Sequence, residues 1–150
     1  MILTVATIGK EGYPHCTPVW FVVENGKLYF RANPSKQKVL NIRRNDRVCC
    51  SVEDGEVYSE LRGAMITGRA RLLTPGDFFN NINNKLLEKY RAERDYNNLP
   101  LEWRRNFENE DRVIVEATPQ RVTSWDNRKW LRRGVGLAVR PRRHSKTRVP

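Results

Sequence analysis

The pattern of strands and turns in the first 31 residues constrains the fold more than any other feature of the chain. Residues 2–8 are apolar and rich in β-branched side chains, a glycine-rich turn follows, and residues 16–23 again carry bulky side chains on both faces. Asn25-Gly26 separates this second run from residues 28–31. Asn-Gly favours a two-residue hairpin because both residues tolerate positive φ angles. We therefore expect the protein to begin with three antiparallel strands.

Two helices are predicted by capping residues and apolar spacing. Ser35 is the expected N-cap of a short helix that runs to about residue 44. Thr74 is the expected cap of a longer helix, in which Pro75 and Asp77 suit the first turn. The apolar stripe of this longer helix consists of Phe79, Ile82, Leu86 and Tyr90.

Four further strands are predicted at residues 48–52, 61–73, 112–118 and 121–125, with a short helical segment around Trp103 and Phe107. Gly63 and Gly68 interrupt the longest of these strands, which indicates bending or close approach of another backbone. Strands and helices do not alternate regularly, so a doubly wound parallel sheet is disfavoured. We predict a mainly β fold, an antiparallel barrel of six to seven strands with peripheral α-helices.

The formal charge of +11 is concentrated at the C-terminal end. Residues 127–150 contain nine cations and no acid, whereas the first 126 residues contain 19 cations and 17 acids. A basic segment of low apolar content is usually a solvated arm, and less often binds nucleic acid or anionic lipid. We expect a folded domain over residues 1–130 and a basic, flexible tail over residues 131–150. Nucleic-acid binding through the tail is an alternative that we do not favour.

Length and cysteine content narrow the class of protein further. A chain of 150 residues suffices for one well-buried core without disulfides or metals. The longest apolar run, residues 19–23, is far shorter than the roughly 18 residues that cross a bilayer, so we expect no membrane span. Cys16, Cys49 and Cys50 are odd in number, and the adjacent pair should point to opposite faces of a strand. Reduced thiols in a cytoplasmic protein are the simplest interpretation.

The segment from Arg31 to Lys38 is the most informative candidate site. Lys36 and Lys38 follow Ser35 at a helix N-terminus, where acids are normally preferred, and Arg31 ends the preceding strand. A bound phosphate would offset this unfavourable placement, because backbone N–H groups, the Ser35 hydroxyl and the cations can converge on it. From the local pattern alone, a solvated lysine pair is an equally good explanation.

Other positions have a structural explanation beside the functional one. Arg62-Gly63 would let a flat ring approach the backbone, although a barrel-corner glycine beside a surface arginine explains it better in isolation. Thr17-Pro18-Val19-Trp20 places a proline within a strand, which indicates an edge or a bulge with backbone groups free for a ligand. Trp125 and Trp130 can cover a cofactor or a dimer interface, but burial in the core is commoner for tryptophan.

The motifs of many catalytic classes are missing from the sequence. It contains only His15 and His144, and it has no Cys-x-x-Cys pair, no phosphate-binding glycine–lysine loop and no Gly-x-Ser-x-Gly elbow. A metal site or a serine-type triad is hard to assemble from these residues. Catalysis would therefore depend on a bound cofactor.

Taken together, these segments resemble the pyridoxamine 5′-phosphate oxidase-like family, the flavin-binding split β-barrels. The resemblance spans about residues 1–130 and depends on the order and spacing of several motifs. These motifs are ATIGKEGYPHCTPVWF at 6–21, SKQKVLNIRRNDRV at 35–48, Arg62-Gly63 through GRA at 68–70, and Ser124-Trp125-Asp126. The basic and histidine pattern of the oxidase proper is not matched after residue 127, so we do not expect vitamin oxidase activity.

The resemblance implies a homodimer with a flavin at the subunit interface, either FMN or a deazaflavin coenzyme, acting as an oxidoreductase on a small-molecule substrate. Lys38 resembles the residue that binds the cofactor phosphate, with Arg31, Ser35 and Lys36 beside it. Thr17, Pro18, Val19 and Trp20 resemble the strand along the flavin ring, Arg62 and Gly63 resemble the strand that approaches the ring from the other side, and Trp125 resembles the late aromatic residue near the cofactor. The alternative from another class is a non-catalytic cofactor- or anion-binding module whose basic tail contacts nucleic acid or anionic lipid. Haem handling is a third interpretation, but His15 alone supplies an axial ligand poorly.

Overall fold

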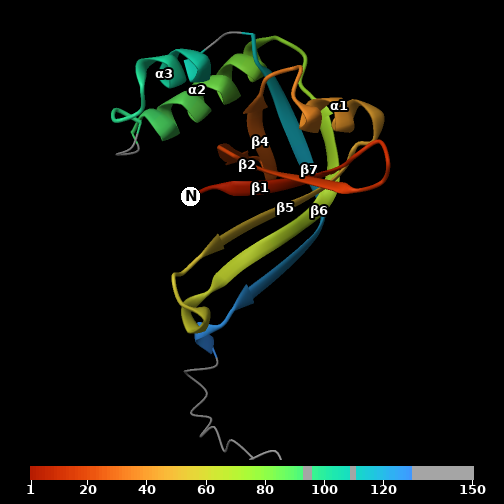
Figure 1. Ribbon diagram of the computed structural model, residues 1–150, viewed down its shortest axis with the longest axis vertical. Helices are drawn as coiled ribbons and strands as arrows, with labels where there is room; N and C mark the ends of the chain where they lie inside the picture. The colour runs from red at the N-terminus through yellow and green to blue at the C-terminus, as the bar shows by residue number, and fades with distance from the viewer. Residues whose placement is uncertain (93–95, 109–110, 130–150) are drawn as a thin grey trace, which may run out of the picture.

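The computed structural model describes residues 1–92, 96–108 and 111–129. Trp130 and the tail predicted at residues 131–150 lie outside these ranges. Within them, seven antiparallel strands form one sheet in the order β2-β1-β5-β6-β7-β4-β3, which curls into a half-barrel with the helices at its periphery (Figure 1). The predicted mainly β split barrel is confirmed. The strands are β1 (Leu3–Ile8), β2 (Pro14–Val19), β3 (Phe21–Glu24), β4 (Lys27–Ala32), β5 (Arg47–Asp54), β6 (Arg62–Leu72) and β7 (Val113–Asp126).

The run predicted as one strand at residues 16–23 is two strands, so that prediction was wrong. The chain leaves β2 at Val19, passes through Trp20 and enters β3 at Phe21. β2 pairs with β1, whereas β3 pairs with β4, so the break marks a change of pairing partner. β2 and β3 are the outer strands of the sheet, and Pro18 therefore lies in an edge strand, as predicted.

The last two predicted strands are a single strand, β7, so that prediction was also wrong. β7 pairs with β6 over their whole common length, and an irregularity in register occurs between Thr67 and Gly68. Gly68 is required there, because a Cβ atom would lie 2.0 Å from the carbonyl oxygen of Thr118. The prediction that this glycine permits close backbone approach is confirmed.

The helices begin later than their predicted caps. α1 (Gln37–Arg44) has Lys36 as its N-cap without a side-chain hydrogen bond, so the capping role predicted for Ser35 was wrong. The Ser35 hydroxyl instead donates to Asn33 Oδ1 at 2.7 Å, which forms a local turn before the helix. α2 (Asp77–Arg91) is preceded by Gly76 at φ 157°, not by a Thr74 cap. The remaining helical segments are η1 (Tyr58–Glu60), a single 3₁₀ turn, and α3 (Leu101–Glu108).

Apolar clusters cover both faces of the sheet. Alternate residues of β4 enter different clusters, because successive side chains of a strand point to opposite faces. Leu28 and Phe30 pack in the barrel interior, while Tyr29 packs beneath α2. Members of the predicted helix stripe fill this second cluster: Ile82, Leu86 and Tyr90, with Phe79 partly buried.

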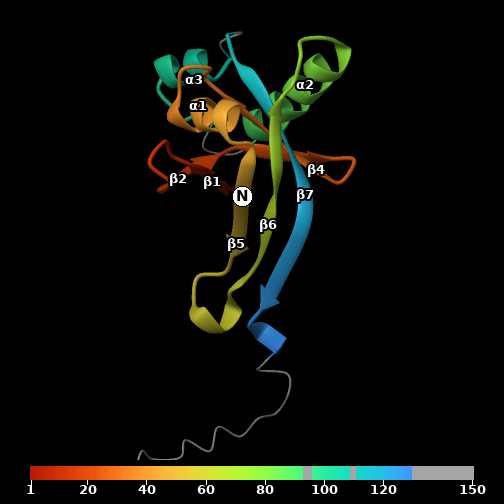
Figure 2. The ribbon, with the colours of Figure 1, turned by 90° about the vertical axis from the view of Figure 1, so that its right-hand side faces the viewer.

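The ends of β5, β6 and β7 extend away from the body as a three-stranded arm, with η1 at its tip (Figures 1 and 2). α1, α2 and α3 lie at the opposite end of the molecule. None of the helices described here combines the length and apolar character needed to cross a bilayer. The three cysteines are free, and Cys50 is buried whereas Cys49 is partly exposed, which confirms that the pair faces opposite sides of β5.

Candidate functional site

A cavity of about 600 Å³ lies where β2, β4, α1, α2 and α3 meet. This size is within the usual range of small-molecule and cofactor sites. The cavity brings together six of the residues proposed from the sequence: Pro18, Val19, Trp20, Arg31, Lys36 and Lys38.

One part of the cavity is strongly cationic. Arg31, Lys36, Lys38 and Arg112 line it, and its described lining includes no acid. Burial lowers the pKa of Lys38, and repulsion from Lys36 and Arg112 lowers it further. The first turn of α1 also contains no acidic residue. Lys36 and Arg112 lie close enough to Lys38 to disfavour its positive charge, so an anion beside Lys38 would be favoured electrostatically.

The remaining wall of the cavity is apolar and aromatic. Trp20 lies on one side, and α3 contributes Trp103, which is 67% exposed. The other apolar lining residues are Ile2, Pro18, Val19, Ala32, Leu86 and Leu99. The cavity thus combines a charged end with a surface suited to a flat, apolar group.

Sequence reasoning missed several of these residues. Arg112 precedes β7, and β7 pairs with β4 so that Val113 lies opposite Ala32. This register carries Arg112 to the same end of the sheet as Asn33, which also lines the cavity. The basic character of Arg112 was visible in the sequence, but its proximity to Lys38 depends on a pairing between residues about 80 positions apart. Nothing in the sequence marked Trp103 and Leu99 as site residues either, because the position of α3 and of the turn before it depends on tertiary packing.

Thr17 and Ser35 do not line this cavity. Ser35 is exposed, and both its backbone N–H and its hydroxyl donate to Asn33 Oδ1. Thr17 Oγ1 is buried and has no hydrogen-bond partner among the described residues. The sheet therefore leaves a polar atom of β2 unsatisfied beside Pro18, which is uncommon in a folded protein.

The other proposed residues, Arg62, Gly63 and Trp125, line a separate cavity of about 400 Å³ on the arm. Gly63 lies opposite Trp125, and a Cβ at this glycine would lie 2.4 Å from the indole ring. The flat group that approaches Gly63 in this chain is therefore the side chain of Trp125. Within one chain, these three residues are not brought to the cationic cavity.

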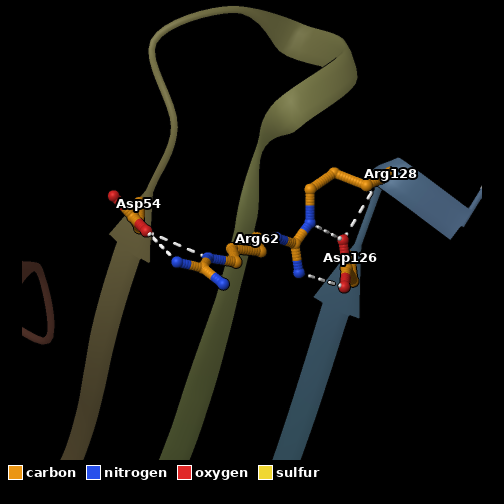
Figure 3. A network of polar contacts seen from close by, with 4 residues as sticks. All are labelled: Asp54, Arg62, Asp126 and Arg128. Carbon is orange, nitrogen blue, oxygen red and sulfur yellow. Dashed lines mark hydrogen bonds and ion pairs between the residues drawn. The ribbon is translucent and has the colours of Figure 1, made fainter.

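Two ion pairs lie at this end of the arm (Figure 3), and three of their four residues, Asp54, Arg62 and Asp126, line the second cavity. Arg62 donates to Asp54 Oδ2 from Nε at 2.9 Å and from a terminal nitrogen at 2.6 Å. Asp126 accepts hydrogen bonds from Arg128, which lower the pKa of its carboxyl to about 2. Both pairs are open to solvent, the Asp54–Arg62 pair more so than the Asp126–Arg128 pair, so they contribute little to stability.

The curled sheet of seven antiparallel strands defines the class of the protein as a split β-barrel. The sequence profile of the pyridoxamine 5′-phosphate oxidase family matches residues 2–126, and the chain belongs to that family. None of the curated proteins matches the chain significantly.

Solved structures support this assignment. The chain is 30% identical to the conserved hypothetical protein Rv2991 from Mycobacterium tuberculosis, with a TM-score of 0.71 over 86% of this chain and 79% of that one. It is 25% identical to an F420 reductase, with a TM-score of 0.61 over 82% of this chain and 89% of the other. An FAD-binding protein from Mesorhizobium loti shares the fold at 17% identity, with a TM-score of 0.62 over 82% of each chain.

Proposed function

We propose that this protein is a flavin-type oxidoreductase that binds FMN or a deazaflavin coenzyme and acts on a small-molecule substrate. The observation that carries the proposal is the composition of the 600 Å³ cavity, which has four cations and an aromatic, apolar wall. A cofactor with a phosphate and a flat ring system has the same division between a charged and an apolar part. The family membership and the similarity to an F420 reductase support this class of cofactor.

Different residues of the cavity would bind different parts of the cofactor. Lys38, with Lys36 and Arg31, would hold the phosphate, and the partial burial of Lys38 strengthens its attraction to an anion. The backbone and side chains from Pro18 to Trp20 would lie along the ring.

A cofactor bound in this way supplies hydride or electron transfer through its ring, and the chain supplies binding, orientation and exclusion of water. We assign no side chain as catalytic acid or base. We further propose that the protein is a homodimer with the cofactor at the subunit interface. In such a dimer, Arg62, Gly63 and Trp125 of one protomer would approach the cofactor held by its partner, which accounts for their separation from the cationic cavity within one chain.

The test is cofactor uptake by the purified protein. We expect visible absorption from a bound flavin or deazaflavin, or its appearance on titration with FMN or F420, and mass analysis of the material released on denaturation would identify the cofactor. Lys38→Ala should weaken uptake at least tenfold, because a charge-assisted hydrogen bond is lost from a half-buried site. Lys10→Ala removes the same charge from an exposed turn and should leave uptake unchanged.

Absence of binding to both cofactors would overturn the proposal. If such a protein also bound nucleic acid with steep salt dependence, and lost this binding when residues 131–150 were removed, the non-catalytic module would be the better description.

A further inference from the structure

Trp20 lies at the point where the chain passes from one edge of the sheet to the other. It falls between the register of β2 with β1, which ends at Val19, and the register of β3 with β4, which begins at Phe21. Strand pairing therefore fixes the residues on either side of Trp20 but not Trp20 itself. Because Trp20 lines the cationic cavity, the groups that hold it in place also shape that cavity.

Tyr90, near the end of α2, makes extensive contact with this point. Its ring stacks on the ring of Trp20 with a centroid distance of 4.5 Å and an interplanar angle of 7°. The backbone N–H of Phe21 donates to Tyr90 Oη at 2.8 Å. The Tyr90 hydroxyl in turn lies within hydrogen-bonding distance of two carbonyl oxygens, 3.2 Å from that of Phe21 and 3.3 Å from that of Met1. One buried side chain thus satisfies the backbone next to Trp20 and supports its ring.

Neighbouring residues of α2 reinforce this arrangement. Lys89 Nζ donates to the Phe21 carbonyl oxygen at 2.7 Å and lies 4.2 Å from the centroid of the Phe21 ring. Leu86, one helical turn before Tyr90, lines the cavity directly. The apolar stripe of α2 therefore does more than cover the sheet, since its last turn contacts the wall of the candidate site.

We propose that Tyr90 is a positioning residue for the cavity, which fixes the Trp20 ring and the adjoining Val19–Phe21 backbone against which a flat cofactor ring would lie. This inference rests on the proposed function for its consequence in cofactor binding, but the positioning of Trp20 is measurable without a cofactor. Removal of the Tyr90 hydroxyl would deprive the buried Phe21 N–H of its acceptor, and an unsatisfied buried donor is costly enough to displace the local backbone.

The experiment compares Tyr90→Phe with Tyr29→Phe. Tyr29 is an equally buried tyrosine whose hydroxyl donates to Glu116 Oε2 at 2.9 Å, and it does not line the cavity. Each variant loses one hydroxyl together with its buried hydrogen bonding, so both should lose stability. Circular dichroism would first establish a temperature at which both variants are folded.

A cofactor-free measurement tests the positioning itself. With 5-fluorotryptophan incorporated, the ¹⁹F resonance of Trp20 is identified by its loss in Trp20→Phe. We expect Tyr90→Phe to shift or broaden this resonance and Tyr29→Phe to leave it unchanged. Lys89→Met removes a second contact to Phe21 and should also shift or broaden the Trp20 resonance. This variant replaces Tyr90→Phe in the experiment if Tyr90→Phe does not fold.

Titration with FMN, riboflavin and F420 tests the consequence for binding. Tyr90→Phe should weaken binding of FMN and riboflavin by the same factor, about tenfold, because it acts on the ring wall. Lys38→Ala should instead weaken FMN and spare riboflavin, which has no phosphate. The same Trp20 resonance and the same affinities in both tyrosine variants would overturn the inference. If the wild-type protein binds none of these compounds, the proposed function is overturned, and the Trp20 resonance alone decides the inference about Tyr90.

Discussion

Glu116 is a buried carboxylate whose ionisation should dominate the acid sensitivity of this fold. It is only 3% exposed, and three side chains from neighbouring strands hydrogen-bond to it. Arg71 Nε donates to Oε1 at 2.7 Å, Lys27 Nζ to the same oxygen at 3.0 Å, and the Tyr29 hydroxyl to Oε2 at 2.9 Å. The cluster joins β4, β6 and β7, because Tyr29 and Arg71 both lie opposite Glu116 in the strand register.

These hydrogen bonds determine how far the pKa of Glu116 is lowered and how much its ionisation stabilises the fold. Burial alone would raise the pKa of Glu116, but the hydrogen bonds from Arg71, Lys27 and Tyr29 lower it from 4.5 to about 2. The folded state therefore binds the proton less tightly than the unfolded chain. The resulting stability is present above about pH 4.5 and is lost as the pH falls toward 2. Since one pKa unit corresponds to about 1.4 kcal/mol, the contribution is on the order of 3 kcal/mol.

The assay is urea unfolding followed by circular dichroism between pH 7 and pH 3. We expect Glu116→Gln to be less stable than the wild type at pH 7 and to show a shallower loss of stability with acid. Asp54→Asn is the matched control, because it removes a carboxylate from an exposed ion pair and should change the profile little. A Glu116→Gln variant whose free energy of unfolding falls with acid as steeply as that of the wild type would refute this reasoning.

Two further predictions address the sheet and the cationic cavity. Gly68→Ala should destabilise the protein by several kcal/mol or prevent folding, because the new Cβ would collide with the backbone of β7. The Cβ of the control variant Gly12→Ala meets no atom, so this variant should lose only about 1 kcal/mol of stability for its positive φ. Thermal denaturation would compare the two variants, and equal losses of stability would contradict the predicted collision. The affinity for FMN should fall as the pH rises through the lowered pKa of Lys38, earlier than an ordinary lysine would lose its charge. Fluorescence titrations between pH 7 and pH 10.5 would measure this fall. Lys38→Arg, which stays charged, should remove the early part of the fall, and an unchanged profile in this variant would contradict the assignment to Lys38.

Much of the strand pattern was predictable because it is locally encoded. The apolar, β-branched run at residues 2–8 predicted β1. The Asn25-Gly26 turn predicted β4 and the hairpin between β3 and β4, and Asn25 indeed has a positive φ of 49°. The opposite orientation of Cys49 and Cys50 follows from the two-residue period of a strand. The errors occurred at Trp20 and near Gly68, where the identity of the neighbouring strand determines whether the chain breaks or continues.

The candidate site was likewise predictable only in part from the sequence. The unusual lysines at the start of α1 were explained equally well by an anion site and by a solvated lysine pair, and the structure places Lys36 and Lys38 at a cavity with Trp20. Arg112 and Trp103 gave no signal of their own, because a lone arginine and a lone tryptophan are common on any surface. The role considered for Gly63 changed most, since the ring that covers it within this chain belongs to Trp125.

The sequence alone indicated most of the strands and helices of this protein and three of the four cations that line the candidate site. Those features depend on interactions among residues a few positions apart, such as side-chain periodicity, turn geometry and the preferences of a helix terminus. Which of these elements come into contact depends on the tertiary fold. The pairing of β4 with β7 and the packing of α2 behind Trp20 join residues about 70 to 80 positions apart. Contacts of that range arise from burial of shared apolar faces, which no local pattern specifies.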